Sequence, residues 1–183
     1  IEVKLSTGDI RLFNHKNENW TVTVLDTGLN TMTGGRLKYA YDFIQDDEYF
    51  HLTYGDGVGD LDINALEAHH KHYDKLVTMT ISTPPSRFGA VKTKNGIITN
   101  FMEKPKNDYS INAGFFVIKP TVIQDYIEGD STVWEQEPLK ILTKKKQLSA
   151  YKHDGFWQPM DTLREKERLE KLWSSGDAPW KVW

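Results

Sequence analysis

The chain has 183 residues, of which 38% are apolar and 27% are charged, and it contains no cysteine. This length fits a single domain over residues 1–183 that ends in a helical tail over about 161–183. Without cysteine there is no disulfide framework and no thiolate metal site, which fits a cytoplasmic protein. The net charge of −3 and the lack of a long apolar run lead us to expect neither nucleic-acid nor membrane partners.

Predicted strands and helices alternate along the chain. Strands are predicted for four β-branched or apolar runs, Trp20–Leu25, Tyr49–Tyr54, Leu76–Ile81 and Phe115–Ile118. Helices are predicted for Thr33–Ala40 with Thr33 as N-cap, for Asp62–Tyr73 and for Asp161–Trp173, and Pro120 starts a further short one. Asn95-Gly96 predicts a hairpin turn between Gly89–Val91 and Ile97–Phe101. This order predicts an α/β fold with a mostly parallel sheet flanked by helices.

Asp56 lies between two glycines, directly after the predicted strand Tyr49–Tyr54. In open α/β sheets, ligands bind at the carboxyl ends of the strands. A carboxylate at such a place is a natural ligand for Mg²⁺, which takes one or two protein carboxylates and completes its shell with water and phosphate. The alternative is a plain Gly-Asp-Gly turn with no ligand.

Two further polar groups stand next to predicted strands. Glu103 could accept hydrogen bonds from sugar hydroxyls, and Lys104 is a compact point charge suited to a phosphate. Asn112 precedes the strand Phe115–Ile118 and offers both a donor and an acceptor. The alternatives are a solvated strand end at Glu103-Lys104 and a tight bend at Asn112.

Asp161 combines two possible roles at the start of the last predicted helix. It could cap that helix, or it could supply a second carboxylate to the metal held by Asp56. His69, His70 and His72, in the predicted helix Asp62–Tyr73, resemble a zinc cluster in spacing only, since no further ligand stands at a supporting position. A solvated helix face is the favoured interpretation for them.

The order of these segments and the residues within them resemble those of the sugar-1-phosphate nucleotidylyltransferases. The shared segments are Gly55-Asp56-Gly57, Arg87-Phe88-Gly89, Phe101-Met102-Glu103-Lys104-Pro105, Ile111-Asn112-Ala113-Gly114-Phe115-Phe116 and an aspartate after Trp157. Four others resemble the glucose-1-phosphate cytidylyltransferases within that family, namely Thr31-Met32-Thr33-Gly34-Gly35-Arg36-Leu37, Thr132-Val133-Trp134-Glu135-Gln136-Glu137-Pro138, Phe156-Trp157-Gln158-Pro159-Met160-Asp161-Thr162 and Ala178-Pro179-Trp180-Lys181-Val182-Trp183. The resemblance covers nearly the whole chain from about Trp20 onward.

The resemblance implies the reaction CTP + α-D-glucose 1-phosphate → CDP-glucose + pyrophosphate, which serves deoxysugar and O-antigen synthesis in bacteria. It also implies a Rossmann-like fold of the nucleotide-diphospho-sugar transferase type, a homo-oligomer, and Mg²⁺ held by Asp56 and Asp161. Lys104 is then expected at the sugar phosphate and is catalytic together with the two aspartates. On the nucleotide side the resemblance places Thr33, Gly34, Gly35 and Asp56. On the sugar side it places Arg87, Gly89, Glu103, Lys104, Asn112, Gly114, Trp134 and Glu135.

One departure from the family pattern concerns the N-terminal Gly-rich loop, Gly-Gly-x-Gly-Thr-Arg followed by a lysine, which this sequence lacks together with the first βαβ unit. Such a loop wraps the nucleotide phosphates with backbone N–H groups. We therefore expect a polypeptide of this sequence to be inactive and the full-length protein to be active. Two alternatives stay open: a related enzyme that uses UTP, dTTP or ATP, and a non-catalytic subunit that binds a sugar or nucleotide.

Overall fold

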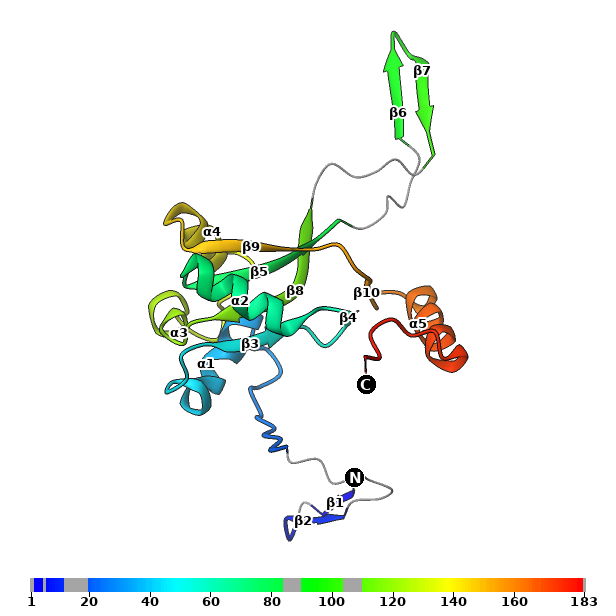
Figure 1. The fold of residues 1–183 in the computed structure, drawn as a ribbon. Coiled ribbons are helices and arrows are strands. Elements are labelled where there is room, and N and C mark those ends of the chain that lie inside the picture. Colours follow the sequence, from blue (N-terminus) through cyan, green and yellow to red (C-terminus); the bar gives the residue numbers. More distant parts are fainter. Residues whose placement is uncertain (1, 5, 12–19, 84–89, 104–109, 183) are drawn as a thin grey trace.

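The computed structural model describes residues 2–4, 6–11, 20–83, 90–103 and 110–182 (Figure 1). The strands are β1 (Glu2–Lys4), β2 (Asp9–Arg11), β3 (Phe50–Thr53), β4 (Gly57–Gly59), β5 (Val77–Ser82), β6 (Ala90–Lys94), β7 (Ile97–Met102), β8 (Ile111–Ile118), β9 (Leu148–His153) and β10 (Trp157–Pro159). The helices are α1 (Thr33–Ile44), α2 (Ile63–Tyr73), α3 (Thr121–Tyr126), α4 (Glu137–Lys144) and α5 (Leu163–Ser175). The predicted helices, the hairpin and three of the four predicted strands are confirmed, with ends shifted by a few residues.

The central sheet has the strand order β3-β8-β5-β9. Only β5 and β9 run parallel, because β8 is antiparallel to both of its neighbours, β3 and β5. The α/β class is confirmed, but the expectation of a mostly parallel sheet is wrong for the described residues, whose sheet is mixed. The reason is that β8 enters the sheet between β3 and β5 from the opposite direction, which no local sequence pattern encodes.

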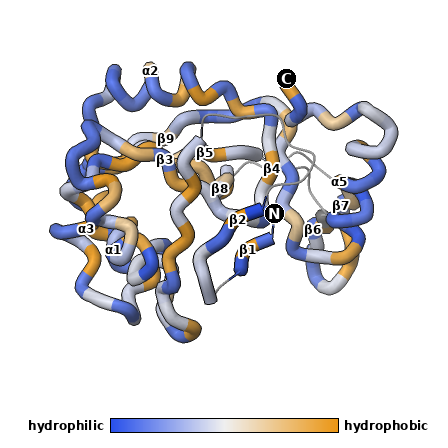
Figure 2. The backbone as a smooth tube through the Cα atoms, turned by 90° about the horizontal axis from the view of Figure 1, so that it is seen from below, coloured by the Kyte–Doolittle hydropathy of each residue, from blue (hydrophilic) through white to orange (hydrophobic). Residues whose placement is uncertain are grey.

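The two faces of this sheet are covered by different helices. Along β5, Val77 and Met79 point into a core that also contains Phe116 of β8 and apolar residues of α1, α3 and α4. Thr78 points to the other face, where its hydroxyl lies 2.8 Å from Nδ1 of His70 on α2. This alternation follows from the two-residue period of a strand. Figure 2 shows the result, with hydrophilic residues predominating along the outer helix α2 and hydrophobic ones on the inner strands.

A short ribbon of β4 and β10 lies between the sheet and α5 (Figure 1). Its antiparallel register pairs Gly57 with Pro159 and Gly59 with Trp157. The indole N–H of Trp157 donates to the Ala113 carbonyl at 2.8 Å, which ties the ribbon to β8. The ribbon therefore joins two segments that are far apart in the chain at one place on the sheet.

The strand predicted for Trp20–Leu25 is not formed. The backbone there is assigned neither strand nor helix, and Trp20, Val22 and Val24 are 77%, 77% and 88% exposed. A strand needs a partner for its backbone groups, and no strand among the described residues pairs with this segment. The β-branched composition was therefore insufficient to form a strand here.

Two helix starts differ by one residue from the prediction. The N-cap of α1 is Met32, and Thr33 is the first helical residue. The N-cap of α5 is Thr162 rather than Asp161, and Thr162 forms a capping box with Glu165. In neither case does the predicted side chain, of Thr33 or of Asp161, cap the helix.

The histidines of α2 do not all lie on a solvated face. His70 is only 2% exposed, which corrects the prediction for that residue. The pKa of its imidazole is lowered, mainly because burial penalises the charged form and also because Lys119 lies nearby. No group of three or more metal-ligating side chains occurs among the described residues, so zinc has no cluster there. Within the same residues, no helix combines the length and the hydropathy needed to cross a bilayer.

The buried His70 makes stability depend on pH. Because its folded pKa lies below the usual value of 6.5, the unfolded chain binds this proton more readily, so stability is lost as pH falls below about 6.5. His69, whose pKa burial also lowers, adds to the effect. We expect the free energy of unfolding in urea to fall from pH 7.5 to pH 5.5, with a slope of up to about 1.4 kcal/mol per pH unit for each proton.

The substitution His70→Asn tests this origin, since Asn keeps a hydrogen-bonding group near Thr78. It should reduce the difference in stability between the two pH values. Leu66→Ala, at a position of the same helix that is 1% exposed, is the control, because it destabilises equally at both pH values. An unchanged pH difference in the His70 variant would show that the effect comes from other groups.

Candidate functional site

A pocket of about 490 Å³ opens where α1 begins and β3 ends. It is lined by Thr33, Arg36, Leu37, Leu52, Thr53, Tyr54, Gly55, Asp56, Trp134 and Glu135. The three charged residues among them are two acids and one arginine. An anionic ligand in this pocket therefore needs additional positive charge, such as a metal ion or basic groups from other segments.

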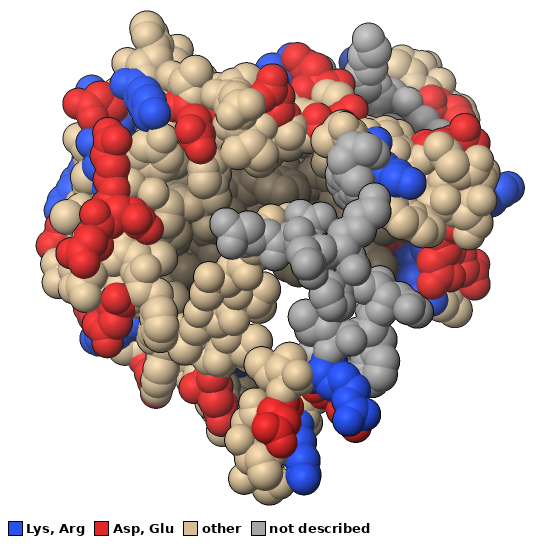
Figure 3. All heavy atoms as spheres, turned by 60° about the horizontal axis from the view of Figure 1, so that its bottom comes forward, with Lys and Arg blue, Asp and Glu red and all other residues tan. Residues whose placement is uncertain are grey.

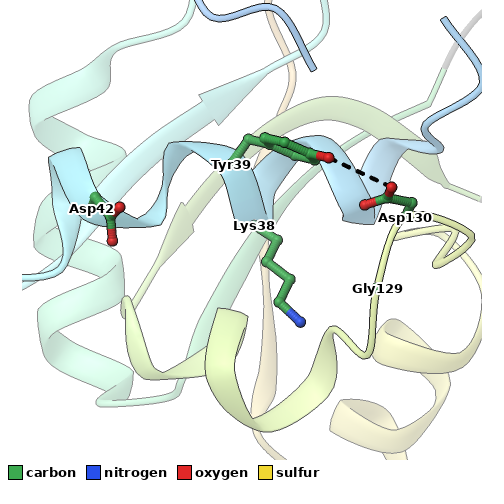
Figure 4. A pocket seen from close by; sticks show the side chains of 5 residues that line it. All are labelled: Lys38, Tyr39, Asp42, Gly129 and Asp130. Carbon is green, nitrogen blue, oxygen red and sulfur yellow. Dashed lines mark hydrogen bonds between the residues drawn. The ribbon is translucent and has the colours of Figure 1, made fainter. Parts of the chain in front are cut away.

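Figure 3 shows one face of the molecule, which is hollowed near its centre and carries acidic and basic side chains around the hollow. A second depression, of about 380 Å³, lies on another face of α1. Figure 4 shows its lining residues, Lys38, Tyr39, Asp42, Gly129 and Asp130. The Lys38 ammonium donates to the Glu128 carbonyl at 2.9 Å, so this lysine is committed to the fold.

Asp56 and Asp161 come from neighbouring backbone positions. The β4–β10 ladder ends with Gly57 opposite Pro159, and the next contact is the N–H of Met160 donating to the Asp56 carbonyl at 2.7 Å. Asp56 and Asp161 therefore follow directly from the same end of the ribbon, and both are exposed. Two carboxylates of this kind fit the needs of Mg²⁺, which fills its remaining positions with water and phosphate oxygens.

Three side chains form a hydrogen-bonded chain along the pocket wall. The Thr33 hydroxyl donates to Oε2 of Glu135 at 2.7 Å and accepts the backbone N–H of Trp134 at 3.0 Å. The Tyr54 hydroxyl donates to Oε1 of the same carboxylate. The pKa of Tyr54 is raised far above its usual value, first by burial and then by its hydrogen bond to the Glu135 carboxylate. The phenol therefore stays protonated, and stays a donor, over the whole physiological range.

Gly34 and Gly35 are buried against the segment that precedes Trp134. Their N–H groups donate to the Thr132 carbonyl at 2.9 and 3.2 Å. A Cβ atom at Gly34 would lie 2.8 Å from that carbonyl oxygen, and one at Gly35 would lie 2.7 Å from Cα of Asp130. The structure thus gives both glycines a packing role. Their predicted contact with a nucleotide stays a prediction.

The segment Asn112–Gly114 lies behind the pocket wall. The Asn112 side-chain oxygen accepts the N–H of Gly114 at 2.9 Å. The Asn112 side chain also hydrogen-bonds the Tyr54 hydroxyl, a contact that offsets part of the rise in the pKa of that phenol. Gly114 has φ +78°, and a Cβ atom there would lie 2.8 Å from the Tyr54 ring. The close approach of Tyr54 therefore requires glycine at this position, and the predicted small-residue segment has a packing reason here too.

The other predicted site residues fall into two groups. Arg87, Gly89 and Lys104 lie outside the described residues. Glu103 is exposed at the end of β7 and is not among the residues that line the pocket. Trp134 and Glu135 do line it, with Trp134 1% exposed and its ring edge-on to Phe116 at 5.8 Å.

Sequence reasoning missed Tyr54 and Arg36. Tyr54 ends the predicted strand just before Gly55-Asp56-Gly57, so its place beside a predicted ligand site was a usable signal. Arg36 follows the two glycines of α1 and lines the pocket, and its guanidinium donates to the Thr27 hydroxyl. In both cases the informative fact was proximity in the chain to a residue already singled out.

A family model described as "Nucleotidyl transferase" matches residues 12–162. The chain is 54% identical over 172 residues to a glucose-1-phosphate cytidylyltransferase of Salmonella typhimurium, covering 93% of this chain and 66% of that protein. It is 40% identical to a probable glucose-1-phosphate cytidylyltransferase of Bacillus subtilis, covering 97% and 69%. The chain thus spans about two thirds of the length of these curated relatives.

Solved structures with similar folds have much lower sequence identity. HddC from Yersinia pseudotuberculosis aligns with a TM-score of 0.58 and 19% identity, covering 79% of this chain and 64% of that one. A putative glucose-1-phosphate thymidylyltransferase from Bacillus anthracis, solved with a sucrose, aligns with a TM-score of 0.57 and 16% identity, covering 79% and 62%. At this level of identity the likeness shows the fold alone.

The contact between Gly114 and Tyr54 can be tested by adding one methyl group. We expect Gly114→Ala to lower the free energy of unfolding by about 2–4 kcal/mol, from backbone strain together with the clash against Tyr54. Gly176→Ala is the matched control, because Gly176 has φ +80° with no atom within 4 Å of the added Cβ, and it should cost only about 1 kcal/mol. Equal losses in urea denaturation would show that Tyr54 does not confine this position.

Proposed function

Because the chain belongs to the nucleotidyl transferase family, we propose that the protein transfers CMP from CTP to α-D-glucose 1-phosphate. The products are CDP-glucose and pyrophosphate. The proposal is supported by the ribbon, in which Asp56 lines the pocket and its carbonyl accepts the N–H of Met160, the residue before Asp161. The choice of substrates follows the printed activity of the Salmonella relative, which shares 54% of its aligned residues with this chain.

In this reaction an oxygen of the sugar phosphate attacks the α-phosphorus of CTP in line. The bond from that phosphorus to the bridging oxygen breaks, and pyrophosphate leaves. The attacking phosphate is already ionised near neutral pH, so no general base is required. The protein's work is to place two mutually repelling anions in line and to stabilise the charge of the transition state.

Different residues of the pocket would bind the metal, the sugar and the nucleotide. Asp56 and Asp161 would hold Mg²⁺, which when bound neutralises phosphate charge. The carboxylate of Glu135 repels phosphates, so it suits the hydroxyl-bearing end of the sugar. Asn112, which hydrogen-bonds the same Tyr54 hydroxyl, would lie at that end too. The nucleotide would lie toward the start of α1, where Thr33 and Arg36 line the pocket. Lys104, Arg87, Gly89 and Glu103 would complete the sugar-phosphate side.

The biological setting of the proposal follows from the product. A nucleotide-activated glucose would serve the assembly of deoxysugars for bacterial surface polysaccharide, including O-antigen.

We also propose a homo-oligomer, supported by apolar side chains at the C-terminal end of the chain. Leu163 and Trp173 of α5 are 70% and 51% exposed, and Val182 is 80% exposed. Exposed apolar groups in one region are typical of subunit contacts.

The two aspartates should be indispensable for turnover. We expect Asp56→Asn and Asp161→Asn, each made in the complete gene product, to lower kcat at least about a hundredfold, because each removes a charged metal ligand. The readout is pyrophosphate release from CTP and glucose 1-phosphate with Mg²⁺. The exposed Asp154, whose carboxylate pairs with Lys152 at 2.7 Å, is the control, and Asp154→Asn should keep wild-type activity. Activity within tenfold of wild type in either variant would contradict the proposed metal site.

The base of the nucleotide is tested separately. With glucose 1-phosphate fixed, we expect kcat/KM for CTP to exceed those for UTP, dTTP and ATP by at least about tenfold, since specific hydrogen bonds to a base edge can discriminate strongly. A higher kcat/KM for another nucleotide would support the same type of reaction with that nucleotide, rather than CTP, as the substrate. Binding of CDP-glucose in calorimetry with no turnover of any nucleotide would instead favour a non-catalytic binding protein.

A further inference from the structure

We infer that Tyr54 is a positioning residue for the sugar phosphate, acting through the Glu135 carboxylate. The inference rests on the proposed function, because it assigns a role within the same pocket. The network itself is a fact of the fold: the two oxygens of Glu135 accept one hydroxyl each, from Tyr54 and from Thr33. These two hydrogen bonds, here called the clamp on Glu135, have a consequence for ligand binding.

The direction of each hydrogen bond in the network is determined. The Trp134 N–H donates to the Thr33 oxygen, so the Thr33 hydroxyl proton is free to donate to Glu135. The raised pKa of Tyr54 keeps its phenol protonated, so it too donates to the carboxylate. Both oxygens of Glu135 are thus fixed from the protein side, while each keeps a lone pair for a further donor.

Without this clamp, Glu135 would be a mobile side chain. It is exposed to solvent, and ordering a free glutamate side chain costs about 1.5–2 kcal/mol. Two hydroxyl donors hold the carboxylate in place before a ligand arrives. The entropy cost of ordering the side chain therefore does not reduce the binding free energy. A ligand with hydroxyl donors then meets a fixed acceptor.

Tyr54 is suited to hold this carboxylate because it is itself fixed on several sides. Its backbone N–H donates to the Gly114 carbonyl at 3.1 Å, and its ring lies 5.8 Å from that of the fully buried Phe116. Gly114 leaves the space that the ring occupies. Tyr54 also stands two residues before Asp56, so one short segment sets both the acceptor for the sugar and the acid for the metal.

The charge of Glu135 decides which part of the substrates it serves. A carboxylate repels phosphate groups, so it belongs at the polyhydroxyl end of the sugar rather than beside the triphosphate. The Thr33 and Tyr54 hydroxyls both donate their protons to Glu135, so neither hydroxyl can also donate to a ligand. The loss of the Tyr54 hydroxyl should therefore weaken sugar-phosphate binding and leave the nucleotide unaffected.

The test is Tyr54→Phe in the complete gene product, which removes one oxygen and keeps the ring. We expect KM for glucose 1-phosphate to rise about tenfold, in line with the loss of one hydrogen bond to a charged group. The values of kcat and of KM for CTP should stay within about twofold. Tyr39→Phe is the matched control, since the Tyr39 hydroxyl contacts Asp130 at 3.5 Å on another face of α1 (Figure 4). It should leave all three parameters unchanged.

A double-mutant cycle separates positioning from a general effect on the fold. In an Glu135→Ala background, Tyr54→Phe should change KM for glucose 1-phosphate by less than about twofold, because its route of action is gone. A tenfold rise that persists in that background would overturn the inference, as would an unchanged KM in the single variant or a rise in KM for CTP instead. Absence of turnover in the wild-type protein, by contrast, would overturn the proposed function and the inference together.

Discussion

The arrangement of the site depends on the antiparallel pairing of β4 with β10. Three residue pairs, from Gly57–Pro159 to Gly59–Trp157, set Asp56 next to Met160 and Asp161. An isolated two-stranded ribbon of this length is not stable in water. The geometry of the two acids must therefore be maintained by contacts that hold the ribbon to the rest of the molecule.

Three side chains supply those contacts from three elements. The Trp157 indole binds the Ala113 carbonyl of β8, and Arg168 of α5 donates to the Gln158 side chain at 2.9 Å. At the far end of the ribbon, the imidazole of His153 lies 3.1 Å from the Asp60 carboxylate and 3.0 Å from the Phe156 carbonyl. His153 is 9% exposed, so this contact is shielded from solvent. The ribbon is thus held at its middle and at the end away from the aspartates, which leaves the end with Asp56 and Asp161 open to ligands.

Local patterns in the sequence predicted the elements well and their partners poorly. The Asn95-Gly96 turn, the buried run before Ile118 and the helix before Tyr73 are each encoded within a few residues, and each formed as predicted. The bond between Tyr54 and Glu135 joins residues far apart in the chain, so no local spacing could indicate it. The strand predicted for Trp20–Leu25 was wrong for a related reason. Its composition favours a strand, but a strand also requires a neighbouring strand, which the local sequence does not specify.

The glycines show how one residue type can be read in two ways. Gly34, Gly35 and Gly114 are placed where a ligand could approach the backbone, and the sequence alone allows that interpretation. In the structure each lies against protein atoms, with no room for a Cβ beside Thr132, Asp130 or Tyr54. The contacts of Gly34 and Gly35 hold α1 against the segment before Glu135, and the contact of Gly114 packs Tyr54 against β8, so together they shape the walls of the pocket. The glycines therefore affect ligand binding through the position of the walls, whether or not a ligand touches them. The chemistry is left to the few polar side chains that those walls expose.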